Sequence, residues 1–178
     1  MWSSEVTNMI ITGIWETLYM TLVSTLVGYV IGLPMGIILT VSDKDGIKPN
    51  AVLYKILDVI ANIVRSVPFI ILLVLLIPFT RLVVGKSYGS TATIVPLVIA
   101  AAPYIARMVE SSLKEVDAGV IEAARSMGAS NFTIITKVML VEARTSLLVG
   151  ATITLGTILG YSAMSGAVGG GIFSFVMM

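Results

Sequence analysis

The chain has 178 residues, of which 57% are hydrophobic and only 12% are charged. Soluble domains carry about 25% charged residues, so this composition excludes an ordinary soluble enzyme or a disordered chain. Its 11 basic and 10 acidic residues nearly cancel, so the overall charge argues against nucleic-acid binding. The sequence has no cysteine and no histidine, which excludes thiol nucleophiles, imidazole bases and Cys/His metal sites. We therefore expect a membrane protein with no catalytic residues and no metal ligands.

Long uncharged stretches indicate where the chain crosses the membrane, because charged side chains are costly in hydrocarbon and a crossing helix needs about 20 apolar residues. In chain order, we expect spans at about residues 17–42, 56–84, 88–108 and 142–165. The second of these reads as one tilted or bent span. The sequence thus predicts an all-α membrane protein, a polytopic transmembrane helix bundle, forming a single domain over residues 1–178.

Basic residues predict the orientation of the spans. Nine Lys and Arg residues flank the first and third connections, whereas only Arg81 and Lys86 flank the second. Since Lys and Arg are retained in the cytoplasm, we expect the N-terminus outside and the connection at about residues 115–138 inside. The first 16 residues carry no basic residue, unlike a cleavable signal peptide, so we expect them to stay in the mature chain.

Two sets of glycines predict close helix packing. Gly28, Gly32 and Gly36 recur every four residues, which places them on one face of the first span. Gly156 and Gly160 repeat this spacing in the fourth span. We interpret both faces as surfaces on which another helix can approach closely.

Charged residues at the end of the third span suggest pairing rather than ion coupling. Arg107, Glu110 and Lys114 are spaced for one helix face, which favours pairing near the helix end. No Asp or Glu lies near the centre of any expected span, which argues against a proton- or sodium-coupled transporter.

Candidates for the transport pathway lie in the fourth span, which is rich in small residues. We take Tyr161, Ser162 and Met164 as candidates for a gate or a substrate contact. The alternative is ordinary packing, since Met readily fills gaps between helices.

The third connection has the pattern of a short helix, a turn and a second helix. Asp117 is suited to cap a helix over about residues 118–127, Gly128 to end it, and Ser130 to cap the next helix. The expected apolar stripe of the short helix comprises Val120, Ile121, Ala124 and Met127.

This connection carries a specific motif. Residues 122–129, Glu-Ala-Ala-Arg-Ser-Met-Gly-Ala, resemble the EAA loop of permease subunits in binding-protein-dependent ABC importers. Val141 stands where that motif usually has proline. Residues 65–73, 102–110 and 160–169 also resemble permeases of the methionine-importer subgroup.

The resemblance implies a function and a set of partners. In that family the loop is a coupling helix that enters a cleft of an ATP-binding subunit. By motif position, the residues that couple to the ATPase are then Glu122, Ala123, Ala124, Gly128 and Ala129. The implied protein is a bacterial inner-membrane permease that imports a small amino acid, methionine (D or L) or an analogue. Its implied partners are an ATP-binding subunit dimer, a second permease copy, an extracytoplasmic substrate-binding protein and membrane lipid, with no nucleic acid. ATP and magnesium belong to the ATPase, and this chain itself binds no cofactor.

One feature departs from the subgroup, whose permeases usually have five spans. Residues 172–178 form an apolar stub that rises only about 10 Å as a helix, too short for a bilayer of about 30 Å. We therefore expect four spans, with the fifth missing. Two alternatives remain open: a channel or secondary transporter that needs no ATPase, and a truncated permease remnant that transports nothing.

Overall fold

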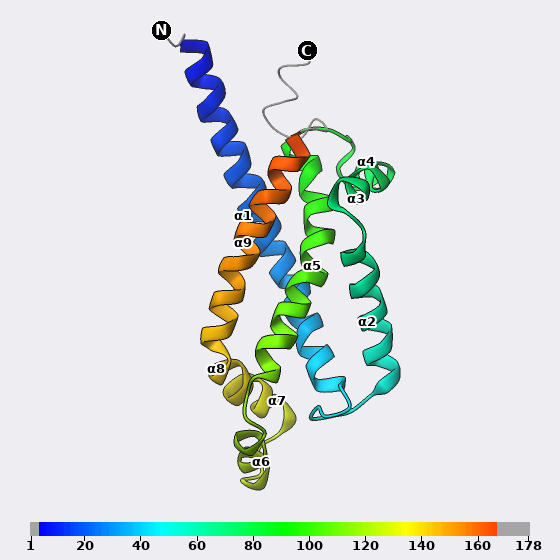
Figure 1. Ribbon diagram of the computed structural model, residues 1–178, viewed down its shortest axis with the longest axis vertical. Coiled ribbons are helices and arrows are strands. Elements are labelled where there is room, and N and C mark those ends of the chain that lie inside the picture. The colour runs from blue at the N-terminus through cyan, green and yellow to red at the C-terminus, as the bar shows by residue number, and fades with distance from the viewer. Residues whose placement is uncertain (1–3, 167–178) are drawn as a thin grey trace.

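The computed structural model describes residues 4–166, and every regular element in this range is helical. Three long helices, α1 (Ser4–Ser42), α5 (Ser90–Lys114) and α9 (Arg144–Gly166), run side by side along the length of the molecule (Figure 1). Helix α2 (Ala51–Ser66) packs against α5 and α1. The shorter elements are α3 (Phe69–Leu75), α4 (Ile77–Val84), α6 (Ala118–Ser126), α7 (Asn131–Thr133), the π-helix η1 (Ile134–Met139) and α8 (Leu140–Glu142). The result is an all-α transmembrane bundle.

The long helices are the strongest candidates for membrane spans. α1, α5 and α9, with 39, 25 and 23 residues, are long and apolar enough to cross a bilayer. Their bounds differ from the expected segments mainly because α1 begins well before residue 17 and α5 continues to Lys114. Residues 172–178, for which the sequence predicted no fifth span, lie outside the described residues.

The second expected span, residues 56–84, is three helices rather than one. α2 and α3 are bent by 102° relative to each other, as in a broken span or a re-entrant loop. The break falls at Val67 and Pro68, both of which have extended ψ angles. Proline lacks an amide hydrogen and disfavours helical conformation in the residue before it, which explains the interruption. α4 then ends at Gly85, whose φ is +81°.

The closest approach between long helices joins α1 to α5. A Cβ atom added to Gly32 would lie 2.6 Å from the carbonyl oxygen of Ala102 and 2.7 Å from Cβ of Ile105. At Gly36 it would lie 2.6 Å from the carbonyl oxygen of Ala106. Real Cβ atoms do not tolerate such distances to backbone, so only glycine permits this contact. The packing face expected along α1 therefore meets α5.

The second glycine face meets no helix among the described residues. An ideal Cβ on Gly156 or Gly160 has nothing within 4 Å, and both residues are exposed in the described part of the chain. The four-residue spacing does place them on one side of α9, but neither α1 nor α5 lies against that side. No helix among residues 4–166 covers this face, so the close helix approach expected at Gly156 and Gly160 stays a prediction.

The two glycine faces predict opposite responses to an added methyl group. We expect Gly36→Ala to lower the free energy of unfolding by about 1–3 kcal/mol, because α5 must move away from α1. Gly160→Ala is the matched control, and it should be neutral or slightly stabilising, since alanine favours a helix more than glycine does. Thermal unfolding midpoints of the purified variants in detergent measure the difference. Equal midpoints for Gly36→Ala and the wild type would contradict this account of the packing.

Candidate functional site

Helix α6 lies beyond the ends of the long helices, at the lower end of the bundle (Figure 1). Asp117 caps its start, and the side chain of this residue accepts a hydrogen bond of 2.7 Å from the backbone N–H of Gly119. A capped first turn satisfies an amide hydrogen that otherwise has no partner within the helix. The predicted short helix is therefore present, with Asp117 in the expected place.

The end of α6 is a sharp turn at Gly128, whose φ of +80° is accessible mainly to glycine. The N–H of Gly128 donates to the carbonyl oxygen of Arg125 over 2.9 Å, and that of Ala129 donates to Ala124 over 3.1 Å. These two bonds close the last turn of the helix. Gly128 is thus the turn residue that the motif required.

The chain then returns to the bundle through an irregular helix. Ser130 caps α7 by accepting a bond of 3.2 Å from the N–H of Thr133. The π-helix η1 follows, and its Ile134 and Met139 are buried. The cap was predicted, but the π-helix was not. These buried side chains fix the returning segment to the bundle.

Contacts on one side hold α6 against the rest of the molecule. Ala124 is buried, and the Arg125 guanidinium donates a hydrogen bond of 3.0 Å to the carbonyl oxygen of Ile47 in the α1–α2 connection. A cavity of about 430 Å³ separates the remaining part of α6 from the ends of α1 and α5. Glu122 lines this cavity from the α6 side.

The motif residues of the α6 region differ in exposure. Ala124 faces inward and Ala129 is half-buried, whereas Glu122, Ala123 and Gly128 are exposed. Those three are free to meet another molecule.

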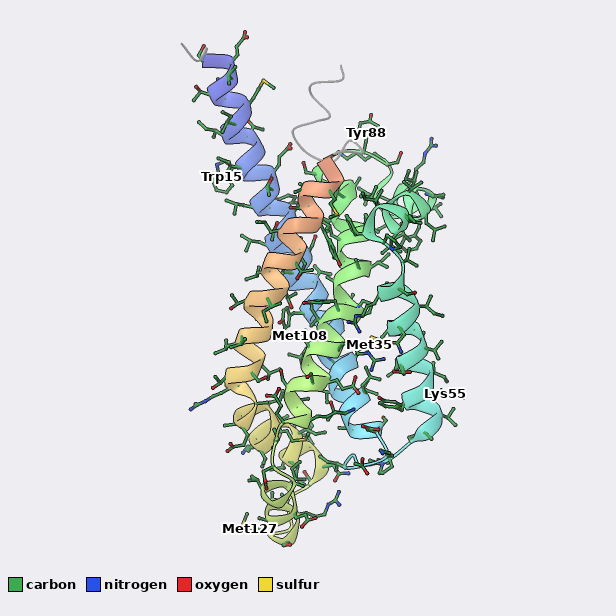
Figure 2. All side chains as sticks on the ribbon, in the orientation of Figure 1. Trp15, Met35, Lys55, Tyr88, Met108 and Met127 are labelled. Atoms are coloured by element: carbon green, nitrogen blue, oxygen red, sulfur yellow. The ribbon has the colours of Figure 1, made fainter. Side chains whose placement is uncertain are left out.

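The predicted apolar stripe is only half correct. Ile121 and Ala124 face the bundle, but Val120 is exposed and Met127 is 81% exposed. Met127 lies at the far tip of the molecule, where no long helix extends to cover it (Figure 2). Phe132 of α7 is also exposed. We call Val120, Met127 and Phe132 the apolar tip.

A buried carboxylate lies above α6, on α5. The side chain of Glu110 is 5% exposed and accepts three hydrogen bonds. Its Oε2 accepts from Nη1 of Arg107 at 2.7 Å, and its Oε1 accepts from Nζ of Lys114 at 2.8 Å and from the hydroxyl of Tyr54 at 3.2 Å. Both oxygens therefore have charged or hydroxyl donors, which offsets the cost of burying the charge.

The two cations on either side of Glu110 extend this network to other elements. Arg107 also donates to the Asp58 side chain and, over 3.1 Å, to Oδ1 of Asn62, both on α2. Lys114 pairs with Asp43, just after α1, over 2.7 Å. We call Asp43, Asp58, Arg107, Glu110 and Lys114 the charge network. The expected pairing along α5 is present, but the sequence did not reveal its partners on other elements.

The Asp43 carboxylate titrates below its ordinary range. Its hydrogen bond with the Lys114 ammonium is the main cause that lowers the pKa, and burial opposes it. A carboxyl group with a lowered pKa stabilises the folded state above its unfolded pKa and loses that contribution as pH falls through the folded value.

The three pathway candidates on α9 differ in their surroundings. The ring of Tyr161 stacks on Phe69 of α3, with centroids 4.7 Å apart and an angle of 6° between the rings. Ser162 is buried and donates to the carbonyl oxygen of Leu159 over 2.8 Å, while Met164 is exposed. The stacking partner, Phe69, was missed because it is far away in the sequence.

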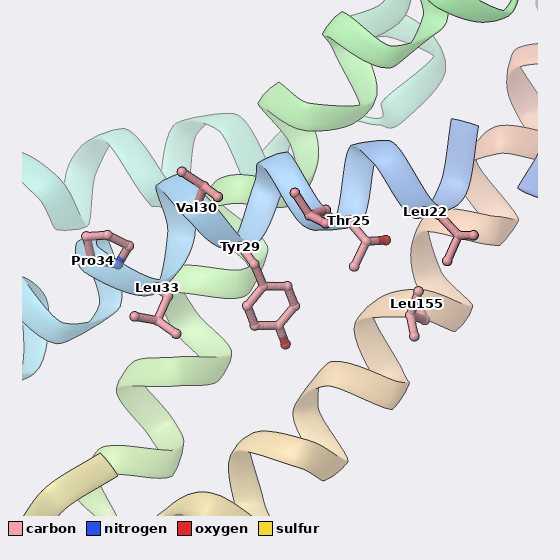
Figure 3. A pocket seen from close by; sticks show the side chains of 8 residues that line it. Leu22, Thr25, Tyr29, Val30, Leu33, Pro34 and Leu155 are labelled. Atoms are coloured by element: carbon pink, nitrogen blue, oxygen red, sulfur yellow. The ribbon is translucent and has the colours of Figure 1, made fainter. Parts of the chain in front are cut away.

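A separate apolar groove of about 630 Å³ runs along α1 beside α9 (Figure 3). Its walls come from α1, including Thr25, Tyr29 and Pro34, and from Leu155 of α9. None of the three pathway candidates lines it. The role of these three residues in the pathway therefore stays a prediction.

The lowered pKa of Asp43 predicts a pH-dependent effect on stability. We expect Asp43→Asn to reduce stability at neutral pH by about 1 kcal/mol or less, because the pair is partly exposed. This difference should shrink as pH falls through the carboxyl pKa, where the wild type also loses its charge. Thermal midpoints of both proteins over a pH series measure it. A difference that grows in acid would contradict the assigned pair.

Comparison with known proteins places these features in a family. The family described as binding-protein-dependent transport system inner membrane component matches residues 28–178. The D-methionine transport system permease protein MetI of Escherichia coli (strain K12) is 56% identical over 158 residues, covering 89% of this chain and 73% of the relative. The protein of that name in Salmonella typhimurium (strain LT2) is also 56% identical, with the same coverage of both chains.

Solved structures agree with the sequence relatives. A chain of the MetNI methionine ABC transporter, in an inward-facing conformation, matches with a TM-score of 0.94 and 54% identity, covering 96% of this chain and 79% of that chain. A chain of an amino acid ABC transporter matches with a TM-score of 0.74 at 24% identity, covering 93% of this chain and 74% of that chain, which shows likeness of fold alone. The match over residues 28–178 and the 56% identity show that this chain belongs to the family of binding-protein-dependent transport system inner membrane components.

Proposed function

We propose that this chain is the permease of an ATP-driven importer that carries methionine, or a close analogue, into the cytoplasm. The observation that carries the proposal is α6, a short capped helix that bears the Glu-Ala-Ala motif and projects beyond the bundle. The α6 region also offers exposed side chains to a partner protein. They are Glu122, Ala123 and the apolar tip. The 56% identity to D-methionine permeases supports the choice of substrate.

The partners we propose are supported by the binding-protein-dependent family to which the chain belongs. We expect a dimer of ATP-binding subunits at α6, a second copy of this chain to complete the pathway, and an extracytoplasmic protein that delivers the substrate. ATP and magnesium would be held by the ATP-binding subunits. The basic residues favour an orientation with the N-terminus outside and α6 in the cytoplasm.

The mechanism requires α6 to transmit movement. Closure of two ATP-binding subunits would displace the two α6 helices of the dimer. Arg125 and the buried Ala124 connect α6 to the bundle, so the displacement passes to the long helices instead of bending a loose loop. Alternating access then arises from rigid-body movement of the bundles.

Two substitutions in α6 test its coupling role. Glu122→Lys reverses the charge of an exposed side chain at the mouth of the cavity beside α6. Gly128→Pro removes the turn, because proline holds φ near −65° whereas Gly128 needs +80°. We expect each to raise the ratio of ATP hydrolysed to substrate imported by about two- to thirtyfold in the purified complex.

The matched control for the charge reversal is Glu5→Lys, at the opposite end of α1. Glu5 is exposed and distant from α6, so its ratio should equal that of the wild type. Unchanged ratios in both α6 variants would remove the proposed role of this helix.

The substrate is tested by uptake into proteoliposomes that contain the complex. We expect ATP-dependent accumulation of labelled methionine that unlabelled D- or L-methionine abolishes and that histidine leaves intact. Accumulation without ATP would instead favour a channel or secondary transporter. Absence of any ATP-dependent methionine uptake would contradict the proposed function.

A further inference from the structure

The charge network joins three parts of the bundle through one buried group. Glu110 on α5 receives a hydrogen bond from Tyr54 on α2, and its neighbour Arg107 pairs with Asp58 on the same helix. On the other side, Lys114 carries the network to Asp43 in the α1–α2 connection. Because Glu110 accepts from both cations, it is the only member that contacts both arms directly among the described residues.

The same network borders the attachment of α6. Asp43 and Lys114 line the cavity that Glu122 and Arg125 line from the α6 side. Arg125 bonds to the carbonyl oxygen of Ile47, and Ile47 belongs to the connection that Asp43 begins. The connection is therefore held by α6 at Ile47 and by Lys114 at Asp43.

We propose that Glu110 is a positioning residue for transport, because it fixes the α1–α2 connection and α2 to α5 so that a displacement of α6 moves all three together. This inference rests on the proposed importer function. Without the carboxylate, Lys114 and Arg107 lose the shared acceptor that holds their side chains in position. Their pairs with Asp43 and Asp58, which join the α1–α2 connection and α2 to α5, then loosen, and the connection held by Arg125 can shift while α5 stays in place. Movement of α6 is then absorbed locally, and ATP hydrolysis continues without equivalent transport.

The burial of Glu110 argues for this role over simple surface pairing. An exposed helix-end ion pair would need neither the Tyr54 hydroxyl nor a second cation. Exposed pairs of that kind contribute little, whereas a group held by several donors in a shielded site keeps a single geometry. A link that transmits movement needs such a fixed geometry.

The test measures coupling in the complete complex, reconstituted in proteoliposomes with its ATP-binding subunit and substrate-binding protein. We expect Glu110→Gln to raise the ratio of ATP hydrolysed to methionine imported by about two- to thirtyfold. The matched control, Glu115→Gln, removes an exposed carboxylate five residues further along the chain and should leave the ratio unchanged. A ratio for Glu110→Gln equal to that of the control would overturn the inference.

A second set of variants tests the outer arm of the network and avoids the buried carboxylate. Asp43→Asn and Lys114→Gln should each raise the ratio of ATP hydrolysed to methionine imported. The double variant should raise it no further than the stronger single variant, because both substitutions break the same Asp43–Lys114 pair. Fully additive effects, or no effect in any of the three, would overturn the link to the α1–α2 connection. A fall in complex yield with an unchanged ratio would also overturn it, since that result shows a role in stability alone.

The wild-type complex separates this inference from the function on which it rests. If the wild type imports methionine and Glu110→Gln does so at the same ratio, only the inference fails. If the wild type hydrolyses ATP but imports no methionine, the proposed function fails, and the inference falls with it.

Discussion

The close contact between α1 and α5 is the constraint on which the rest of the bundle depends. Lipid tails are as apolar as leucine, so helices in a bilayer gain little from hiding apolar side chains and must gain from close packing instead. At Gly32 and Gly36 the α1 backbone lies directly on α5. With α1 on one side and α9 on another, α5 becomes the central helix, and the short elements attach around it.

The central position of α5 explains why its two halves differ. The half near α3 and α4 has no charged residue, whereas the half near α6 carries the charge network. Charges are tolerated there because α2 and the α1–α2 connection, and not lipid, surround them. The buried Glu110 is stable only in that setting, since each of its oxygens has a donor from this end of the bundle. Helix α2 and the α1–α2 connection thus provide the shielded setting that Glu110 requires.

Features set by a few neighbouring residues were predictable, and features set by distant ones were not. Asp117, Gly128 and Ser130 act within one turn of their own positions, so the sequence located the start and end of α6. Tyr54 lies 56 residues from Glu110, and no local pattern links them. Phe69 and Tyr161 are further apart still.

The glycines show the same limit in a single pattern. A four-residue spacing fixes which face of a helix carries the small residues, but it contains no information about what lies opposite. In α1 that face meets α5, and in α9 the face of Gly156 and Gly160 meets no helix among residues 4–166. The bend between α2 and α3 was partly predictable, since Pro68 interrupts the helix, but its angle of 102° depends on how α3 packs against α5 and α9.

The attachments of α6 decide which helices a force on its tip can reach. The backbone leads directly from α5 into α6. On the other side of α6, α7, η1 and α8 lead into α9, and Ile134 and Met139 of η1 are buried. The bond from Arg125 to Ile47 adds the connection that follows α1. A displacement at Met127 therefore enters all three long helices through separate links. Only the link to α1 lacks a short covalent path, since Ile47 and Arg125 are 78 residues apart, so it depends entirely on noncovalent contacts. Two sets of contacts consequently determine whether α1 follows the other two helices. They are the pair of Asp43 with Lys114 and the packing of the α1 glycine face against α5.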